Sequence, residues 1–239
     1  MEPRSAPAES TTGSPVAPPQ QRWRLVLARS AGAPRLAGRE LAEAWDEALE
    51  GSGLPLHRPA GRLRARIALG APLPLGMAGE RELAEILLVE RVPIWRMRVA
   101  LDGRLPEGWS LVDLFDVWVG GPPLAGRVIA ADYRVELSEA VEPVEIAGAA
   151  RDLLQARELP RVRQKGEGTV AYDLRPLLAE VSVDGSGKRS TLRIRTRIHP
   201  ELGSGRPEEV VAALGDRLGH PLEVTTIVRE RLILADDAR

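Results

Sequence analysis

The hydrophobic pattern of this chain predicts the same order of strands and helices twice. This repetition constrains the fold more than any other feature of the sequence. Between Arg22 and residue 121, apolar side chains alternate in some segments and recur every three to four residues in others. This predicts strands and helices in the order strand, helix, strand, strand, helix, strand. Gly120 to Pro123 then break the pattern. From there to residue 239 the same order returns, with an extra strand or a broken hairpin near its middle.

Individual segments carry this prediction. In the first half, strands are predicted over residues 22–30, 62–70, 81–92 and 109–119, with helices within residues 38–53 and after Pro93. In the second half, strands are predicted over residues 127–137, 158–165, 169–183, 191–199 and 222–234, with helices over residues 143–156 and from Pro207 to Gly219.

The repeated order is that of the ferredoxin-like split βαβ unit. We therefore predict an α+β protein of the tandem ferredoxin-like class: two βαββαβ units, residues 22–121 and 122–239, each an antiparallel sheet with helices on one face. Residues 1–21 are rich in Pro, Ala, Ser and Thr and have no apolar periodicity, which predicts a disordered tail. They lack the apolar centre of a signal peptide, and no run approaches 18 apolar residues. We expect a cytoplasmic protein that does not contact a membrane.

The composition excludes several kinds of catalytic and metal-binding site. The chain has a net charge of -1 and no Cys, which excludes a disulfide framework, a catalytic thiol and a cysteine-held Fe–S cluster. The three histidines, His57, His199 and His220, lack metal-ligand spacing, so we expect no metal and no cofactor. Arg outnumbers Lys 31 to 2 and Asn is absent, which indicates a GC-rich genome and favours a thermophilic bacterium.

Several segments, in this order, resemble a radical SAM-linked uncharacterised family, domain of unknown function 2344 (DUF2344). They are ALEGSGLPL, IALGAPLPLG, GERELAEILL, LPEGW, ADYRVEL, KGEGTVAYDLRPLL and RPEEVVAALG. The most specific parts of the resemblance contain Asp173, Arg175, Pro176, Pro207 and Glu209. The resemblance implies an accessory protein encoded beside, or fused to, a cobalamin-type radical SAM protein. It also implies a gene neighbourhood with a ribonuclease E/G and ribosomal proteins.

The chain departs from the family's usual pattern in two segments. A Ser-His-Leu-Asp run that usually enters the first helix is replaced by residues 36–41, Leu-Ala-Gly-Arg-Glu-Leu. A Gly-Phe-Asn-Pro-His motif before the second strand is replaced by residues 58–62, Arg-Pro-Ala-Gly-Arg. If those polar residues form a site in the family, this chain lacks it, so we expect a divergent, non-catalytic member.

Three groups of basic residues form the candidate surface. Residues two apart share one face of a strand, so each group is predicted on one face: Arg62, Arg64 and Arg66; Arg161, Arg163 and Lys165; Arg193, Arg195 and Arg197. The last two groups are expected on one sheet. Clustered arginines suit phosphate, which favours RNA, although solvated faces paired with acids would have the same pattern. Asp173 and Arg175 are predicted as an ion pair that braces the turn into Pro176, with a partner contact as the alternative.

These observations predict a non-enzymatic accessory or binding module that works with a radical SAM protein and is RNA-associated through its basic sheet faces. One alternative is an RNA-processing or RNA-modifying enzyme, similar in fold to the RAMP-type endoribonucleases. Another is a structural protein-interaction scaffold. A contiguous positive stripe on the open face of the second half would favour nucleic acid, and a mosaic of paired charges would favour protein or no partner.

Overall fold

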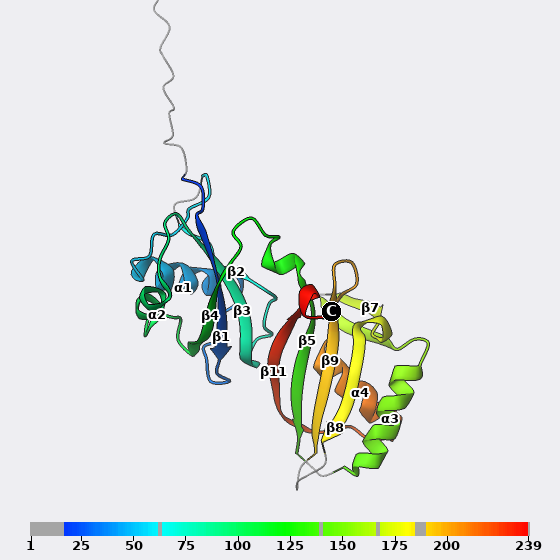
Figure 1. Cartoon of the computed structure of the whole chain (residues 1–239). Helices are drawn as coiled ribbons and strands as arrows, with labels where there is room; N and C mark the ends of the chain where they lie inside the picture. Colours follow the sequence, from blue (N-terminus) through cyan, green and yellow to red (C-terminus); the bar gives the residue numbers. More distant parts are fainter. Residues whose placement is uncertain (1–16, 62–63, 139–140, 166–167, 185–189, 239) are drawn as a thin grey trace, which may run out of the picture.

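A single sheet of nine strands runs through the protein. The computed structural model describes residues 17–61, 64–138, 141–165, 168–184 and 190–238 (Figure 1). The strands follow the order β10-β9-β5-β11-β3-β1-β4, with β2 paired to β3 and β8 paired to β9. The protein is thus an α+β structure in which most neighbouring strands are antiparallel. Among the described helices, none is long and apolar enough to cross a membrane.

The first half surrounds its own hydrophobic core. Neighbouring strands here follow the order β4-β1-β3-β2 and are all antiparallel. Alternating Trp23, Leu25 and Leu27 of β1 are buried in one cluster with Trp45 and Leu49 of α1. The elements are β1 (Gln21–Arg29), α1 (Gly38–Gly51), β2 (Ala68–Leu69), β3 (Ala78–Leu88), α2 (Ile94–Leu101) and β4 (Trp109–Val117).

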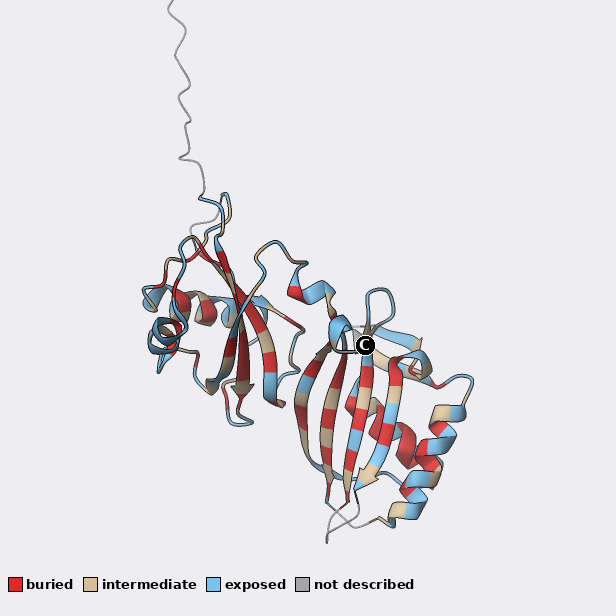
Figure 2. Ribbon diagram, viewed as in Figure 1, coloured by how far each residue is buried: buried red, intermediate tan, exposed pale blue. Residues whose placement is uncertain are grey.

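The second half repeats this arrangement around a second core. Its strands follow the order β11-β5-β9-β8, again antiparallel, and α3 and α4 cover one face of them (Figure 1). Buried and more exposed residues alternate along these strands (Figure 2). The elements are η1 (Leu124–Gly126), β5 (Val128–Leu137), α3 (Pro143–Gln155), β6 (Pro160–Lys165), β7 (Gly168–Asp173), η2 (Arg175–Leu177), β8 (Leu178–Asp184), β9 (Thr191–His199), β10 (Gly203–Ser204), α4 (Pro207–Leu218), β11 (Val224–Leu234) and η3 (Ala235–Ala238).

Two predicted strands differ from the structure. The strand predicted over residues 62–70 is reduced to Ala68–Leu69. Ahead of it, the Ala65 amide donates to Glu50 Oε1 of α1 (3.5 Å), so Ala65 contacts the helix. The strand predicted over residues 169–183 is interrupted by η2, because Pro176 has no N–H to donate to a ladder.

The start of the fold lies just inside the predicted tail. Residues 1–16 of that tail lie outside the described residues. Gln21, the last residue assigned to it, belongs to β1 and is buried. Its side-chain amide donates to Asp116 Oδ2 (2.8 Å) and accepts from the Val92 amide (2.8 Å). These two bonds connect β1 with β4 and with the start of α2, so Gln21 is part of the folded structure.

The two halves are joined where β11 runs parallel to β3, with Arg229 opposite Gly79. The Arg229 side chain is 2% exposed and forms a two-pronged ion pair with Glu82, with Nε 2.8 Å from Oε1. It also donates to the Pro72 and Ala71 carbonyls, at 3.0 and 3.1 Å. A Cβ at Gly79 would lie 2.6 Å from Glu82 Oε1, so glycine leaves the space that this pair occupies.

Removing one partner of this pair should destabilise the whole protein. We expect Arg229→Leu to lower the free energy of unfolding by about 3–5 kcal/mol, because it leaves the Glu82 charge buried without a counter-ion. Arg193→Leu is the matched control, since it breaks an ion pair at a half-exposed arginine and should cost about 1 kcal/mol or less. Urea denaturation measures both. Equal losses in the two variants would contradict the prediction.

Candidate functional site

The open face of the second half carries a mosaic of paired charges. Arg195 contacts Asp132 through two hydrogen bonds, at 2.6 and 3.0 Å, and Arg231 contacts the same carboxylate at 2.8 Å. Glu230 accepts from both Arg134 and Arg193. The predicted Arg193 and Arg195 therefore share this face with acids from β5 and β11. The geometry is that of cross-strand pairing and not of a continuous positive stripe.

Asp132 is the centre of this mosaic. Burial would raise the pKa of its carboxyl, but the hydrogen bonds from Arg195 and Arg231 outweigh burial and lower it below its ordinary value. A lowered carboxyl pKa contributes stability above the pKa of the unfolded chain and loses it as pH falls through the folded pKa. The arginine side chains consequently serve the fold at neutral pH.

The remaining second-half basic residues lie elsewhere. Arg197 donates to the Pro176 and Leu178 carbonyls, at 3.1 and 3.0 Å. Arg161 lies on the β6–β7 hairpin and forms an ion pair with Asp216 of α4 at 2.7 Å. Its hairpin pairs only with itself, in a separate two-stranded sheet. The expectation that the two second-half groups share one sheet is therefore wrong, because β6 pairs with β7 and not with the sheet that contains β9.

Two further members of the predicted surface differ in their surroundings. Arg163 lies over the ring of Tyr172, with its guanidinium carbon 4.9 Å from the ring centroid. Burial, followed by the charge of Glu209, raises the pKa of Tyr172. Lys165 ends β6, and its side chain lies outside the described part of the structure.

The first-half group lies ahead of β2. Arg62 lies outside the described residues. Arg64 is 3.9 Å from Asp46 of α1. Arg66 is exposed, and no ion pair joins it to an acid among the residues that the structure describes. Both arginines line the cavity described below.

The motif residues brace the second half through its backbone. Asp173 Oδ1 accepts from the Leu159 and Arg175 amides, at 2.7 and 2.9 Å. Arg175 donates to the Leu154 carbonyl in the last turn of α3 (2.6 Å) and to the Leu178 carbonyl. The two side chains thus hold the turn as predicted, but no ion pair between them is present among the described contacts.

The second motif begins α4. Pro207 occupies the first turn, where its missing N–H costs no helical hydrogen bond, and it is buried. Glu209 follows in the same turn, where a carboxylate interacts favourably with the helix dipole. In the described part of the chain, no cluster of three or more His, Asp or Glu side chains could hold a metal ion.

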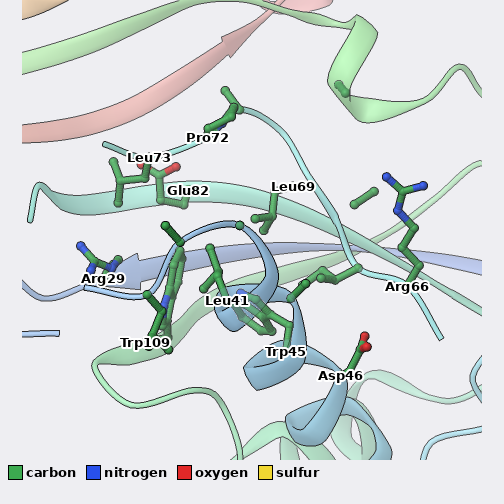
Figure 3. Close-up of a pocket in the computed structure, with 18 of the residues that line it drawn as sticks. Arg29, Leu41, Trp45, Asp46, Arg66, Leu69, Pro72, Leu73, Glu82 and Trp109 are labelled. Carbon is green, nitrogen blue, oxygen red and sulfur yellow. The ribbon is translucent and has the colours of Figure 1, made fainter. Parts of the chain in front are cut away.

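Sequence reasoning missed a large concave feature, a cavity of about 1050 Å³ in the first half (Figure 3). It lies between α1, residues 64–75 and β3, with Ala125 from the connection between the halves also in its wall. Trp45 and Trp109 meet edge to face in this wall, with ring centroids 5.3 Å apart. The apolar lining includes Leu41, Leu69 and Leu73.

Charged and polar groups interrupt this apolar wall. Figure 3 shows Arg29 and Glu82 toward one end of the cavity and Arg66 and Asp46 toward the other. The Trp45 Nε1 hydrogen is buried and has no acceptor among the described atoms. The cavity therefore combines a large apolar surface with a few polar groups, as ligand pockets do.

Residues from both segments 36–41 and 58–62 line this cavity. Leu36, Ala37, Gly38 and Leu41 line it from the start of α1, and Gly61 lines it from the following loop. Both segments were singled out in the sequence. Their proximity was not, because it depends on how the loop folds back over α1.

Fold and cavity together define an α+β protein with two similar halves and one large apolar-walled cavity. The chain belongs to the family described as "Uncharacterized protein conserved in bacteria (DUF2344)", whose model matches residues 22–211. No curated protein matches the chain. Among solved structures, a chain of the "Crystal Structure of a Cbf5-Nop10-Gar1 Complex" is similar, with 12% identity and a TM-score of 0.49. The match covers 88% of this chain and 48% of that one.

Proposed function

We propose that this chain is a cytoplasmic, non-enzymatic accessory module that binds a protein partner, and that the partner is the radical SAM protein implied by the family resemblance. The observation that carries this proposal is a set of exposed apolar side chains on α2 and β4. Trp95 and Val99 of α2 are 65% and 70% exposed, and Trp118, just beyond β4, is 77% exposed. The others are Ile94, Val112 and Phe115.

The position of this apolar set supports a protein contact. β4 is the last strand of the sheet and pairs only with β1, so its outer edge is free of strand pairing among the described residues. An ion pair between Arg98 and Asp113 (2.9 Å) joins α2 to β4. Aromatic residues are enriched at protein interfaces, and large exposed apolar patches mark interaction sites.

We also propose that each half is a ferredoxin-like unit. In both halves the strands lie in the order fourth, first, third, second, when the inserted β6–β7 hairpin and β10 are set aside. A helix follows the first and the third strand of each half. This arrangement is the split βαβ pattern, and it leaves α2 and β4 at the outer end of the sheet.

Changing the apolar set should weaken partner binding without unfolding the protein. We expect Trp95→Ser with Val99→Ser to lower the affinity for the radical SAM protein of the same genome by about tenfold or more, because interface aromatics dominate binding energy. Pull-down and titration of the two purified proteins measure this.

The matched control is Val144→Ser with Val162→Ser. Val144 is 76% exposed on α3, close to the exposure of Val99, and Val162 is exposed on β6. This control should bind as the unchanged protein does. Absence of binding by the unchanged protein, or equal weakening in both variants, would rule out the proposal.

A second candidate function is RNA contact by the β6–β7 hairpin, favoured by one observation. Arg163 stacks on Tyr172, and arginine planes and aromatic rings are the groups on which RNA bases stack. Arg193 and Arg195 of β9 are held by carboxylates, so phosphates would meet the hairpin more readily than β9.

For this second function, filter binding with RNA at two salt concentrations is the test. Arg163→Gln should lower the affinity and make its salt dependence shallower, since each phosphate contact releases about one counterion. Changing Arg193, Arg195 and Arg197 together to Gln should leave the affinity unchanged. If the unchanged protein does not bind RNA at low salt, the hairpin is not an RNA site.

A further inference from the structure

We propose that the cavity beside α1 binds a small molecule with an apolar body and one anionic group, a carboxylate or a phosphate. This site is separate from the α2 and β4 surface of the proposed function. It has residues of its own, so either proposal can fail without the other.

The size and the wall of the cavity suit such a molecule. Its volume of about 1050 Å³ is at the upper end of ligand pockets, which run from roughly 300 to 1,000 Å³. Leu41, Leu69 and the Trp45–Trp109 pair form a continuous apolar lining in Figure 3. An apolar ligand body against this lining would leave water, and burial of apolar area would stabilise the complex.

The positive charge of Arg29 at one end of the cavity favours an anionic group of the ligand. Arg29 is 6% exposed, and its guanidinium donates to the Met77 and Pro34 carbonyls, at 2.8 and 2.9 Å. No ion pair joins Arg29 to an acid within the described ranges. Glu82 lies at the same end, but its charge is matched by Arg229. A buried guanidinium without a counter-ion is costly, and a ligand anion would offset that cost.

The cavity wall also contains a buried polar group without a hydrogen-bond partner. The Trp45 side chain is fully buried in the cavity wall, and its Nε1 hydrogen has no acceptor among the described atoms. A buried donor without a partner costs free energy of the order of a lost hydrogen bond. The Nε1 hydrogen itself is covered by protein, so the position of the anionic group is argued from Arg29.

The other end of the cavity does not favour an anion to the same degree. There Asp46 lies 3.9 Å from Arg64, so an acid already accompanies the arginines. The side chains of Arg64 and Asp46 are also more exposed than Arg29. We therefore place the anionic group at Arg29 and the apolar body along Leu41, Trp45 and Leu69.

Calorimetric titration with three eight-carbon probes tests the assignment on the full chain. The probes are octanoate, 1-octanol and octylammonium, which share one apolar body and differ in charge. We expect saturable binding of octanoate at one site, and affinities for octanol and octylammonium at least about tenfold weaker, since hydrogen bonds to a charged group contribute roughly this much.

Two variants locate the site. Arg29→Met should lower the affinity for octanoate to that for octanol and leave octanol binding unchanged, which also shows that the variant is folded. Arg66→Met, at the other end, should change octanoate binding little. Leu41→Trp should narrow the cavity beside Trp45 and weaken binding of octanoate, whereas Val144→Trp on α3 should not.

Three results would overturn the proposal. The first is no saturable binding of octanoate to the unchanged protein. The second is equal affinity for the three probes, which would remove the anionic group from the assignment. The third is an octanoate affinity that Leu41→Trp leaves unchanged, which would place the ligand away from Leu41. The ligand series with the unchanged protein decides the charge preference even if Arg29→Met fails to fold.

Discussion

The ion pair between Arg229 and Glu82 is the interaction on which the rest of the structure depends. It lies where β11 of the second half meets β3 of the first, and it joins residues 147 positions apart in the chain. The same guanidinium holds the Ala71 and Pro72 carbonyls, which belong to the loop that forms part of the cavity wall. Burial would lower the pKa of Arg229, but Glu82 raises it above its ordinary value, so the guanidinium stays charged.

This junction connects the fold to both candidate surfaces. The strands of the two halves form one sheet across this junction, and β4 is an edge strand of that sheet. The cavity lies beside the junction, in the first half. Cavities near the boundary between two folded units are common ligand sites. The buried charges have opposite signs at Arg229 and Glu82, and Arg29 adds a further positive charge nearby. Its guanidinium holds the Met77 and Pro34 carbonyls.

Much of the fold could be predicted because period-two and helical apolar patterns are local. Trp23, Leu25 and Leu27 face the core as their alternation predicts, and α4 runs from Pro207 to Leu218 before the left-handed Gly219. The sequence indicated a turn into Pro176, but the predicted strand over residues 169–183 ran through it, and the structure breaks that strand at η2. The face of each β9 arginine was predictable, but its partners were not. Asp132 and Glu230 come from strands far away in the sequence, and pairing register decides which charges meet.

We expect the Arg229–Glu82 junction to make the two halves unfold as one cooperative unit. Native-state hydrogen exchange over a range of low denaturant concentrations tests this most directly, because it reports the free energy of each opening event. We expect the most protected amides of β1, β3, β5 and β11 to exchange through the same global unfolding. Their opening events should then have one free energy and one dependence on denaturant concentration. Exchange of the β1 and β3 amides through an opening that leaves β5 and β11 protected would contradict it.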